Sequence, residues 1–472
     1  MIITKGISVS LSRRLLRPRR AIGALAMLAI GTSFAVANTE AAAAKPKHHV
    51  LLVCNGTVKC PDAKGTHYYK SLALAVSRAV SGDYIMVWPG LYKESVTVQP
   101  GHGLSHDLHI IGMNRNGVVF DGTKTGGSAV HVIGVKNTWV ENMTGQHYHS
   151  GSANAFYWTG VDGYWGNYLT AYDNGDYGIY AYDSTSTGPT PSTFAFDYGS
   201  WNADSGIYIG GCRDCNAVIT NSQAEYNPIG YSGTNAGGAL YLLNSEWDHN
   251  ASGIVPNTLT SEPDPPQDGV VIANNYVHDN NQTNTPGAGI TAIAPVGYGI
   301  EIAGGWNDII RSNLIVNEKH AGVALHWLYT PTAFNQVLNN TFKHVGYSGT
   351  PGDADVANDV TGIMNCSDGN VDMTGGKAHP ATLDPANVAN LSNCGSSNPG
   401  RKQGRGIYEP GDPLFSIMTA LNAVGITEKK DYKGPGPRPE AQKTMPNPCK
   451  GVPDNAWCRA DKPVFKAPSH SS

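Results

Sequence analysis

A short motif recurs along the middle of the chain, in which a small residue is followed by apolar residues at alternating positions. Residues 178–181 have the sequence GIYA, residues 206–209 GIYI and residues 299–302 GIEI. Successive copies begin 23 to 28 residues apart, except for a gap of 46 residues before Gly299. The other copies begin at Ala129, Ala155, Gly230, Gly253 and Gly322. This alternation predicts short strands with one inward face.

The repeat predicts a solenoid in which each unit forms one coil. No helical periodicity separates the apolar runs, and each unit ends in a polar stretch that contains asparagine. The Leu pattern of leucine-rich repeats is absent, so an all-β parallel β-helix fits best. Asparagines near the coil ends are predicted to stack between coils and to satisfy backbone groups at the bends. They are Asn174, Asn202, Asn227, Asn250 and Asn317.

Both ends of this solenoid are predicted to carry short capping helices, because an open end would expose unpaired strand edges. Residues 71–80 form an amphipathic run, and Asp412 and Pro413 begin a second candidate helix over residues 414–424. The predicted divisions are 1–44 signal peptide, 45–128 N-terminal cap and first coils, 129–365 repeats, 366–426 C-terminal cap region and 427–472 Pro-rich tail.

The first 44 residues have the pattern of an export signal. Five arginines between Arg13 and Arg20 precede an apolar run over residues 21–37, which small residues follow. A retained membrane anchor is the alternative, although the run is short for a span. We expect a mature chain that has no membrane span and is secreted or held in the cell envelope.

Eight cysteines in an exported chain favour disulfides over metal sites. They fall in four close pairs, and local pairing is the simplest connectivity. The pairs are Cys54 with Cys60, Cys212 with Cys215, Cys366 with Cys394, and Cys449 with Cys458.

Composition removes several classes of protein. Charged residues make up only 15% of the chain and glycine is abundant with 56 copies, which argues against coiled coils and helical arrays. The apolar content of 40% excludes disorder of the whole chain. A net charge of -4 gives no support to nucleic-acid binding.

Several segments carry a family resemblance. Residues 88–94 have the pattern W-P-G-x-Y-x-E, and residues 110–112, residues 119–122 and the G-I-x-I coils follow it. Together they resemble the right-handed parallel β-helix proteins of the pectate-lyase-like superfamily, over about residues 66–365. The resemblance implies a right-handed helix. It implies no single activity, since the superfamily includes lyases, hydrolases, epimerases, esterases and adhesins, and none of its catalytic residues can be placed on this chain.

The middle residue of each G-I-x-I motif is predicted to face outward. Three successive coils place tyrosine there, at Tyr157, Tyr180 and Tyr208. An exposed ladder of rings would stack on the apolar faces of sugars. The alternative is that tyrosines merely suit exposed strand positions and cover one another or an insert.

Two aspartates lie beside this column in consecutive coils. Asp176 and Asp204 each stand two residues before a motif glycine, so stacking would bring their carboxylates about 5 Å apart. Such a pair suits glycosidic acid and base chemistry or a calcium ion. The alternative is two turn aspartates that accept local N–H groups.

Secondary candidates lie in later coils. Asp248 and His249 follow the aspartate pair, and a looser group of two imidazoles and a carboxylate consists of Glu301, His320 and His326. Surface histidines without a role are the alternative. No metal is specified by these residues, and calcium is the one cofactor that the acidic face would accommodate.

The repeat region is acidic, with five basic residues against eighteen acidic ones between Ala129 and Val345. A polyuronate would be repelled unless calcium bridged it to the protein. We therefore expect a monomeric polysaccharide-active protein, either a neutral-glycan hydrolase or a calcium-dependent lyase. The alternative is a β-helix without catalysis that binds glycan or a host surface.

Overall fold

The computed structural model describes residues 48–151, 153–287, 291, 295–349, 353–359, 362–373, 380–382, 391, 393–395 and 432–469. The predicted export segment 1–44 and the predicted helix 414–424 lie outside the described residues. Among the helices that are described, none is long and apolar enough to cross a membrane.

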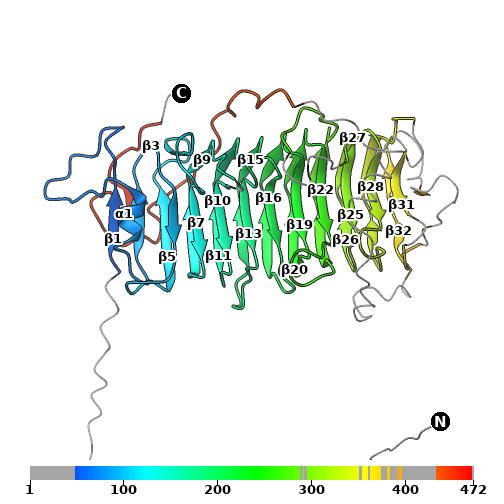
Figure 1. The fold of residues 1–472 in the computed structure, drawn as a ribbon, viewed down its shortest axis with the longest axis horizontal. Helices are drawn as coiled ribbons and strands as arrows, with labels where there is room; N and C mark the ends of the chain where they lie inside the picture. Colours follow the sequence, from blue (N-terminus) through cyan, green and yellow to red (C-terminus); the bar gives the residue numbers. More distant parts are fainter. Residues whose placement is uncertain are drawn as a thin grey trace, which may run out of the picture. The chain divides into compact units, whose positions relative to one another are not determined.

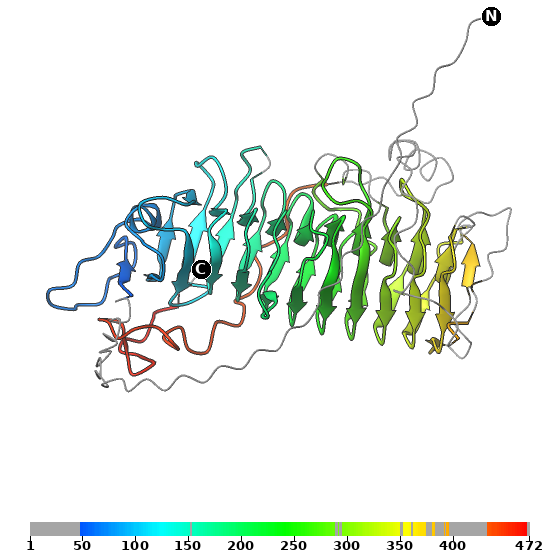
Figure 2. The same cartoon turned by 90° about the horizontal axis from the view of Figure 1, so that it is seen from below.

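Three parallel sheets form the walls of a right-handed β-helix (Figures 1 and 2). We call these sheets A, B and C, whose strands are named below. Each coil runs through sheet C, then sheet A, then sheet B, and each strand pairs with its counterpart in the next coil. The predicted all-β solenoid is therefore confirmed.

Within the described residues, sheet A has twelve strands, and sheets B and C have eleven each. Sheet A consists of β1 (Val50–Val53), β2 (Tyr84–Val87), β5 (His106–Gly112), β8 (Lys136–Glu141), β11 (Tyr164–Asn167), β14 (Ser192–Ala195), β17 (Ala217–Thr220), β20 (Gly237–Leu243), β23 (Asp268–Ala273), β26 (Ile309–Arg311), β29 (Gln336–Leu338) and β32 (Cys366–Asp368). Sheet B consists of β3 (Gly90–Tyr92), β6 (Val118–Asp121), β9 (Thr144–Gln146), β12 (Thr170–Tyr172), β15 (Tyr198–Ser200), β18 (Gln223–Glu225), β21 (Glu246–Asp248), β24 (Tyr276–His278), β27 (Leu314–Glu318), β30 (Thr341–Val345) and β33 (Val371–Asp372). Sheet C consists of β4 (Val96–Val98), β7 (Val130–Ile133), β10 (Phe156–Thr159), β13 (Ile179–Tyr182), β16 (Ser205–Gly210), β19 (Ile229–Thr234), β22 (Ser252–Asn257), β25 (Tyr298–Ala303), β28 (Ala321–His326), β31 (Ala354–Asn358) and β34 (Pro380–Thr382).

Two smaller elements lie outside the three sheets. The run predicted as a helix over residues 71–80 is the short helix α1 (Leu72–Val76), whose N-cap Ser71 accepts a hydrogen bond from Leu74 N–H. Leu72 of this helix is fully buried in the main core. Near the C-terminus, β35 (Cys458–Arg459) and β36 (Lys462–Pro463) form a two-stranded antiparallel sheet.

Inward side chains of sheet C form a continuous apolar ladder through the core. Ile179 pairs with Ile207, Ile207 with Tyr231, Tyr231 with Ile254 and Ile254 with Ile300. All five are fully buried. The inward facing that the alternation predicts is thereby confirmed for Ile179, Ile207 and Ile300.

Buried asparagines stack along the turn between sheets B and C. The backbone N–H of Asn202 donates to Oδ1 of Asn227 at 2.9 Å, and that of Asn227 donates to Oδ1 of Asn250 at 3.0 Å. Asn174 and Asn280 extend the ladder in the two directions. Each amide thus satisfies a buried backbone group of the coil before it.

The prediction for Asn317 is wrong. Glu318 occupies the ladder position and accepts from the backbone N–H of Asn280 at 3.1 Å. Asn317 has a left-handed backbone with φ of 56° and instead contacts Asp279 and His344. Val316 pairs with His278, so Asn317 corresponds to Asp279, which has the same left-handed backbone. The register of the ladder is therefore unchanged, and in this coil a glutamate stands at the position of Asn280.

A similar ladder at the turn into sheet A contains one carboxylate. Oδ1 of Asn335 accepts from Asp308 N–H at 2.8 Å, and Oδ1 of Asp308 accepts from Val270 N–H at 2.8 Å and Gln267 Nε2 at 2.8 Å. Asp308 is fully buried, and this burial raises the pKa of its carboxyl to about 7. Asp308 therefore stands where the next two coils have Asn335 and Asn365.

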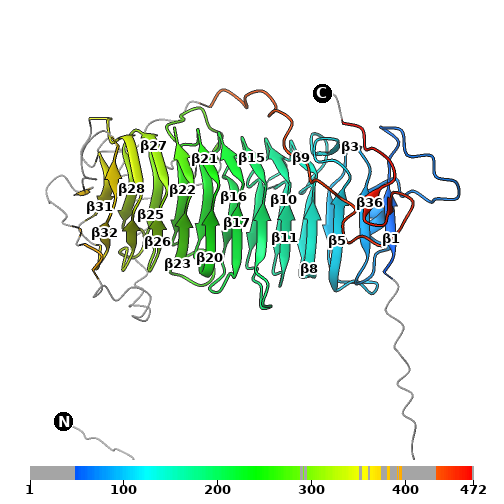
Figure 3. The same ribbon diagram turned by 180° about the vertical axis from the view of Figure 1, so that it is seen from behind.

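The C-terminal segment 432–469 runs back along the outside of the solenoid to the N-terminal coils (Figures 1 and 3). The hydroxyl of Tyr172 donates to Gly436 O at 2.8 Å, and the Trp457 ring lies 5.1 Å from that of Trp88. All four predicted disulfides are confirmed, including Cys449–Cys458 within this segment.

The facing of the coils is tested by truncating one inward and one outward isoleucine. We expect Ile207→Ala to lower the free energy of unfolding by about 2–5 kcal/mol, because Ile207 is fully buried. Ile133→Ala is the matched control, since Ile133 lies on the outer face of the same sheet and is 36% exposed. Chemical denaturation measures both, and equal losses would contradict the assigned facing.

The buried carboxylate predicts a pH dependence of stability. Because the folded-state pKa of Asp308 lies near 7 and its ordinary value is 3.8, the folded state holds this proton more tightly, and stability falls as pH rises between these values. Asp308→Asn keeps an acceptor oxygen and carries no charge. We expect equal stability of the two proteins at pH 4 and a more stable variant at pH 8, with curves that separate by up to about 1.4 kcal/mol per pH unit. Parallel curves in urea denaturation between these pH values would disprove this assignment.

Candidate functional site

The outer face of sheet C changes character along the solenoid. In β10 and β13 buried positions alternate with half-buried ones, as expected for a sheet with one solvated face. In β16, β19, β22, β25 and β28 every position is buried. Described residues of two long connections, 258–267 and 279–297, lie against this face. In the covered part of sheet C, outward polar side chains are therefore buried and not exposed to solvent.

A pocket lies between this covered face and the connections, with about 720 Å³ of space including its mouth. Its apolar wall includes Ile229, Val255, Leu259 and Leu328. The polar and aromatic groups in the lining include Tyr177, Asp204, Asn257, Glu262, Glu301 and His326. A concave apolar site with a few convergent polar groups is typical of ligand binding.

Glu301 and His326 form a buried pair in the wall of this pocket. They come from neighbouring strands β25 and β28, and Nε2 of His326 lies 2.6 Å from Oε1 of Glu301. Burial alone would lower the pKa of His326, but the hydrogen bond and the charge of Glu301 outweigh it and raise that pKa. Oε2 of Glu301 also accepts from Ser252 Oγ at 3.5 Å. The sequence prediction that these two residues approach one another is confirmed.

Glu262 reaches the same pocket from the connection after β22. Its Oε2 accepts a hydrogen bond from the hydroxyl of Tyr208. Burial raises the pKa of the Glu262 carboxyl to about 7, although the Tyr208 hydrogen bond acts in the opposite direction. Near neutral pH this carboxyl can therefore hold and release a proton.

The tyrosine column has the predicted register but not the predicted exposure. Tyr157 pairs with Tyr180, and Tyr180 with Tyr208. The rings of Tyr157 and Tyr180 lie 4.4 Å apart at an angle of 13°, so they stack on each other. Tyr208 is fully buried beneath Tyr177 and Glu262, and the expectation of an exposed ring there is wrong. Coverage by a distant connection is the physical reason.

Asp176 and Asp204 lie in consecutive coils, as predicted from the repeat. The backbone N–H of Asp204 donates to Asp176 O at 2.9 Å. Asp204 lines the pocket and is 8% exposed, whereas Asp176 is half-buried outside the lining. Burial raises the pKa of the Asp176 carboxyl to about 6. Their joint role as a catalytic pair stays a prediction.

The remaining candidates lie apart from the pocket lining. His320 stacks on Tyr298 with ring centroids 5.5 Å apart, and its Nδ1 lies 3.4 Å from Asp353. Asp248 and His249 lie at the end of β21 in sheet B, where Nδ1 of His249 is 2.7 Å from Oδ2 of Asp248. Glu225 joins them in a group whose ligand atoms could hold a metal ion.

Two pocket residues were missed from the sequence. Tyr177 follows Asp176 in a turn, and Glu262 lies in a Pro-rich connection that interrupts the repeat. The gap of 46 residues before Gly299 was the signal that extra chain had been inserted there. It did not indicate which sheet the inserted chain would cover.

Residues 154–342 match the family model described as right handed beta helix region. The A-module of Azotobacter vinelandii mannuronan C-5 epimerase AlgE6 is similar in structure, with a TM-score of 0.50, 13% sequence identity, and coverage of 68% of this chain and 85% of that chain. The endo-xylogalacturonan hydrolase from Aspergillus tubingensis has a TM-score of 0.47 and 11% identity, over 73% of this chain and 97% of that chain.

At these identities the similarity is one of fold. No curated protein sequence matches this chain. The family model, the three parallel sheets and the stacked coils agree with one another. The chain therefore has the fold of a right-handed parallel β-helix.

Proposed function

We propose that the protein cleaves an extracellular polysaccharide in the covered pocket of sheet C. The observation that carries this proposal is the presence of two carboxyl groups in unlike environments in the lining of one pocket. Glu262 has a pKa raised to about 7 by burial, and Glu301 is paired with the imidazole of His326. Carboxyl groups whose environments separate their protonation states can divide the roles of acid and base.

In this proposal Glu262 donates its proton to the glycosidic oxygen as the sugar leaves. The Glu301 carboxylate, held by His326, attacks the anomeric carbon or activates the water that does so. One water is consumed, and its hydroxyl group ends on the anomeric carbon. Its proton goes to Glu262 when Glu301 is the nucleophile; when Glu301 activates the water, the proton goes to Glu301 and then to solvent, and Glu262 takes up a proton from solvent. Asp204 also lines the pocket and is the second candidate for the carboxylate role.

The surroundings favour a neutral sugar over a polyuronate. Three carboxyl groups, those of Asp204, Glu262 and Glu301, line the pocket, and none of its described lining residues is a lysine or arginine. An anionic substrate would need a bound cation to lie there. Tyr177 and the apolar wall suit the C–H faces of sugar rings. The AlgE6 module shows that this fold can carry a site that acts on polysaccharide.

Removal of the acid or of the base tests the proposal. We expect Glu262→Gln and Glu301→Gln each to lower kcat on a neutral glycan by about 10²–10⁴-fold, with KM nearly unchanged, because the loss falls on the transition state. Reducing-end assays on a panel of neutral and acidic polysaccharides measure this effect. Asp183→Asn is the control, since Asp183 is exposed on the turn after β13.

The outcome also separates catalysis from binding alone. Glycan binding without turnover in the unaltered protein would establish a β-helix that only binds, for which the half-buried Tyr157 and Tyr180 provide adjoining contact area. Turnover that survives in both carboxyl variants would place the chemistry elsewhere, with Asp176 and Asp204 as the next pair to change.

The raised pKa of Glu262 predicts a pH profile. An acid must be protonated to act, so kcat/KM should fall as pH rises above about 7. Tyr208→Phe removes a hydrogen bond that favours the ionised form of Glu262, and we expect the falling limb of the profile to move to higher pH. A limb that stays in place in Tyr208→Phe would show that another group supplies the proton.

A further inference from the structure

A group of histidines and carboxylates covers part of the outer face of sheet B, outside the pocket lining. Glu225, Asp248 and His278 occupy equivalent positions in the neighbouring strands β18, β21 and β24. The residue before each of them points into the core and is fully buried. Alternation therefore directs these three side chains outward, at the strand spacing of about 4.8 Å.

His249 joins this group from the turn that follows β21. Its backbone is left-handed, with φ of 52°, and Tyr226 has the same conformation one coil earlier with φ of 57°. The rings of Tyr226 and His249 lie 5.2 Å apart, so the imidazole is supported from one side. The turn brings Nδ1 of His249 to 2.7 Å from Oδ2 of Asp248.

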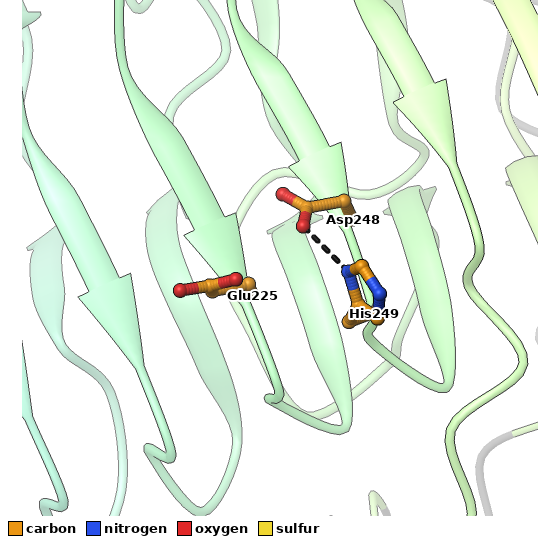
Figure 4. Close-up of side chains that lie close together, drawn as sticks. All are labelled: Glu225, Asp248 and His249. Carbon is orange, nitrogen blue, oxygen red and sulfur yellow. Dashed lines mark hydrogen bonds and ion pairs between the residues drawn. The ribbon is translucent and has the colours of Figure 1, made fainter. Parts of the chain in front are cut away.

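We propose that Glu225, Asp248 and His249 bind a divalent transition-metal ion of the zinc type (Figure 4). One ligand atom from each residue lies within 4.8 Å of the others. Ligands of a tetrahedral zinc ion stand about 3.4 Å apart, so small rotations of the side chains close the site. An imidazole ligand favours zinc and related ions, whereas calcium and magnesium prefer oxygen ligands alone.

The neighbours of these side chains are arranged to orient them. Nε2 of Gln223 donates to Oδ1 of Asp248 at 3.0 Å, and the hydroxyl of Tyr198 donates to Oε1 of Glu225. Such outer contacts fix ligand orientation around metal ions. Asp248 has a side chain that is only 4% exposed, while the imidazole of His249 is 40% exposed and gives access from solvent.

The local charge also favours a cation. Asp248, Glu246 and Asp279 form ion pairs with His249 and His278. Among the described residues, no ion pair joins Glu225, Glu246, Asp248 or Asp279 to a lysine or arginine. A dication bound at Asp248 would therefore neutralise negative charge of these carboxylates, whose ion pairs among the described residues are with imidazoles.

A second combination, Glu246, Asp248 and His278, shares Asp248 with the first. His278 is the poorer ligand of the two histidines, because Nδ1 lies 2.7 Å from Asp279 and Nε2 lies 3.0 Å from Glu246. Carboxylates at both ring nitrogens are the arrangement of an imidazolium ion, which cannot coordinate a metal. His249 is therefore the ligand in the proposed site.

Titration of the metal-stripped protein with Zn²⁺ tests the site. We expect one tight site by calorimetry, a melting temperature that rises with Zn²⁺ concentration, and no comparable effect of Ca²⁺. His249→Asn removes the imidazole and tolerates the left-handed backbone. His249→Asn and Glu225→Gln should each weaken Zn²⁺ affinity by about 100-fold, and Asp248→Asn by at least as much.

Two control variants make the result decisive. His344→Asn changes another exposed histidine with a left-handed backbone and should leave Zn²⁺ affinity unchanged, as should His278→Gln. Absence of Zn²⁺ binding, unchanged affinity in His249→Asn and Glu225→Gln, or equal affinity for Ca²⁺ would each overturn the proposal. Loss of binding in His278→Gln but not in His249→Asn would overturn the ligand assignment. If Asp248→Asn fails to fold, the variants of the two more exposed ligands still decide.

Discussion

Stacking of buried amide side chains at the turns is the constraint on which this structure depends. Each coil must bend between sheets, and every bend withdraws backbone groups from water. A side-chain amide in the next coil satisfies them, as Asn227 does for Asn202 and Asn250 for Asn227. Because the donor and acceptor belong to consecutive coils, the register cannot slip. The outward columns of side chains, including those at both proposed sites, lie at the spacing of the paired strands, in the register that this contact supports.

The pocket results from covering a sheet face that the repeat leaves open. Outward positions of sheet C are half-buried in β13 but buried in β16, β19, β22, β25 and β28. Removal of water raises the pKa of Glu262 and makes the Glu301–His326 pair a buried one. Coverage of the sheet by the connections therefore gives the carboxyl groups of Glu262 and Glu301 unlike environments. The same side chains on an uncovered coil would both be ordinary solvated acids.

Register and facing could be predicted from the sequence, because both follow from local alternation within a repeat. This was enough to align Tyr157, Tyr180 and Tyr208, and to bring Glu301 near His326. Coverage could not be predicted in this way. The group that buries Tyr208 is Glu262, 54 residues further along the chain, and the repeat says nothing about where an interruption folds. Contacts that depend on an insertion were therefore the ones missed.

The returning C-terminal segment changes how the solenoid can come apart. Coils that touch only their neighbours lose order one at a time from an end, since each boundary is independent of the rest. Segment 432–469 contacts coils as far apart in sequence as those holding Trp88 and Tyr172, and the Cys449–Cys458 bridge lies within it. Fraying of the first coils must then also release contacts several coils away. The segment thus gives a modular array the cooperativity of a single globule over its N-terminal half.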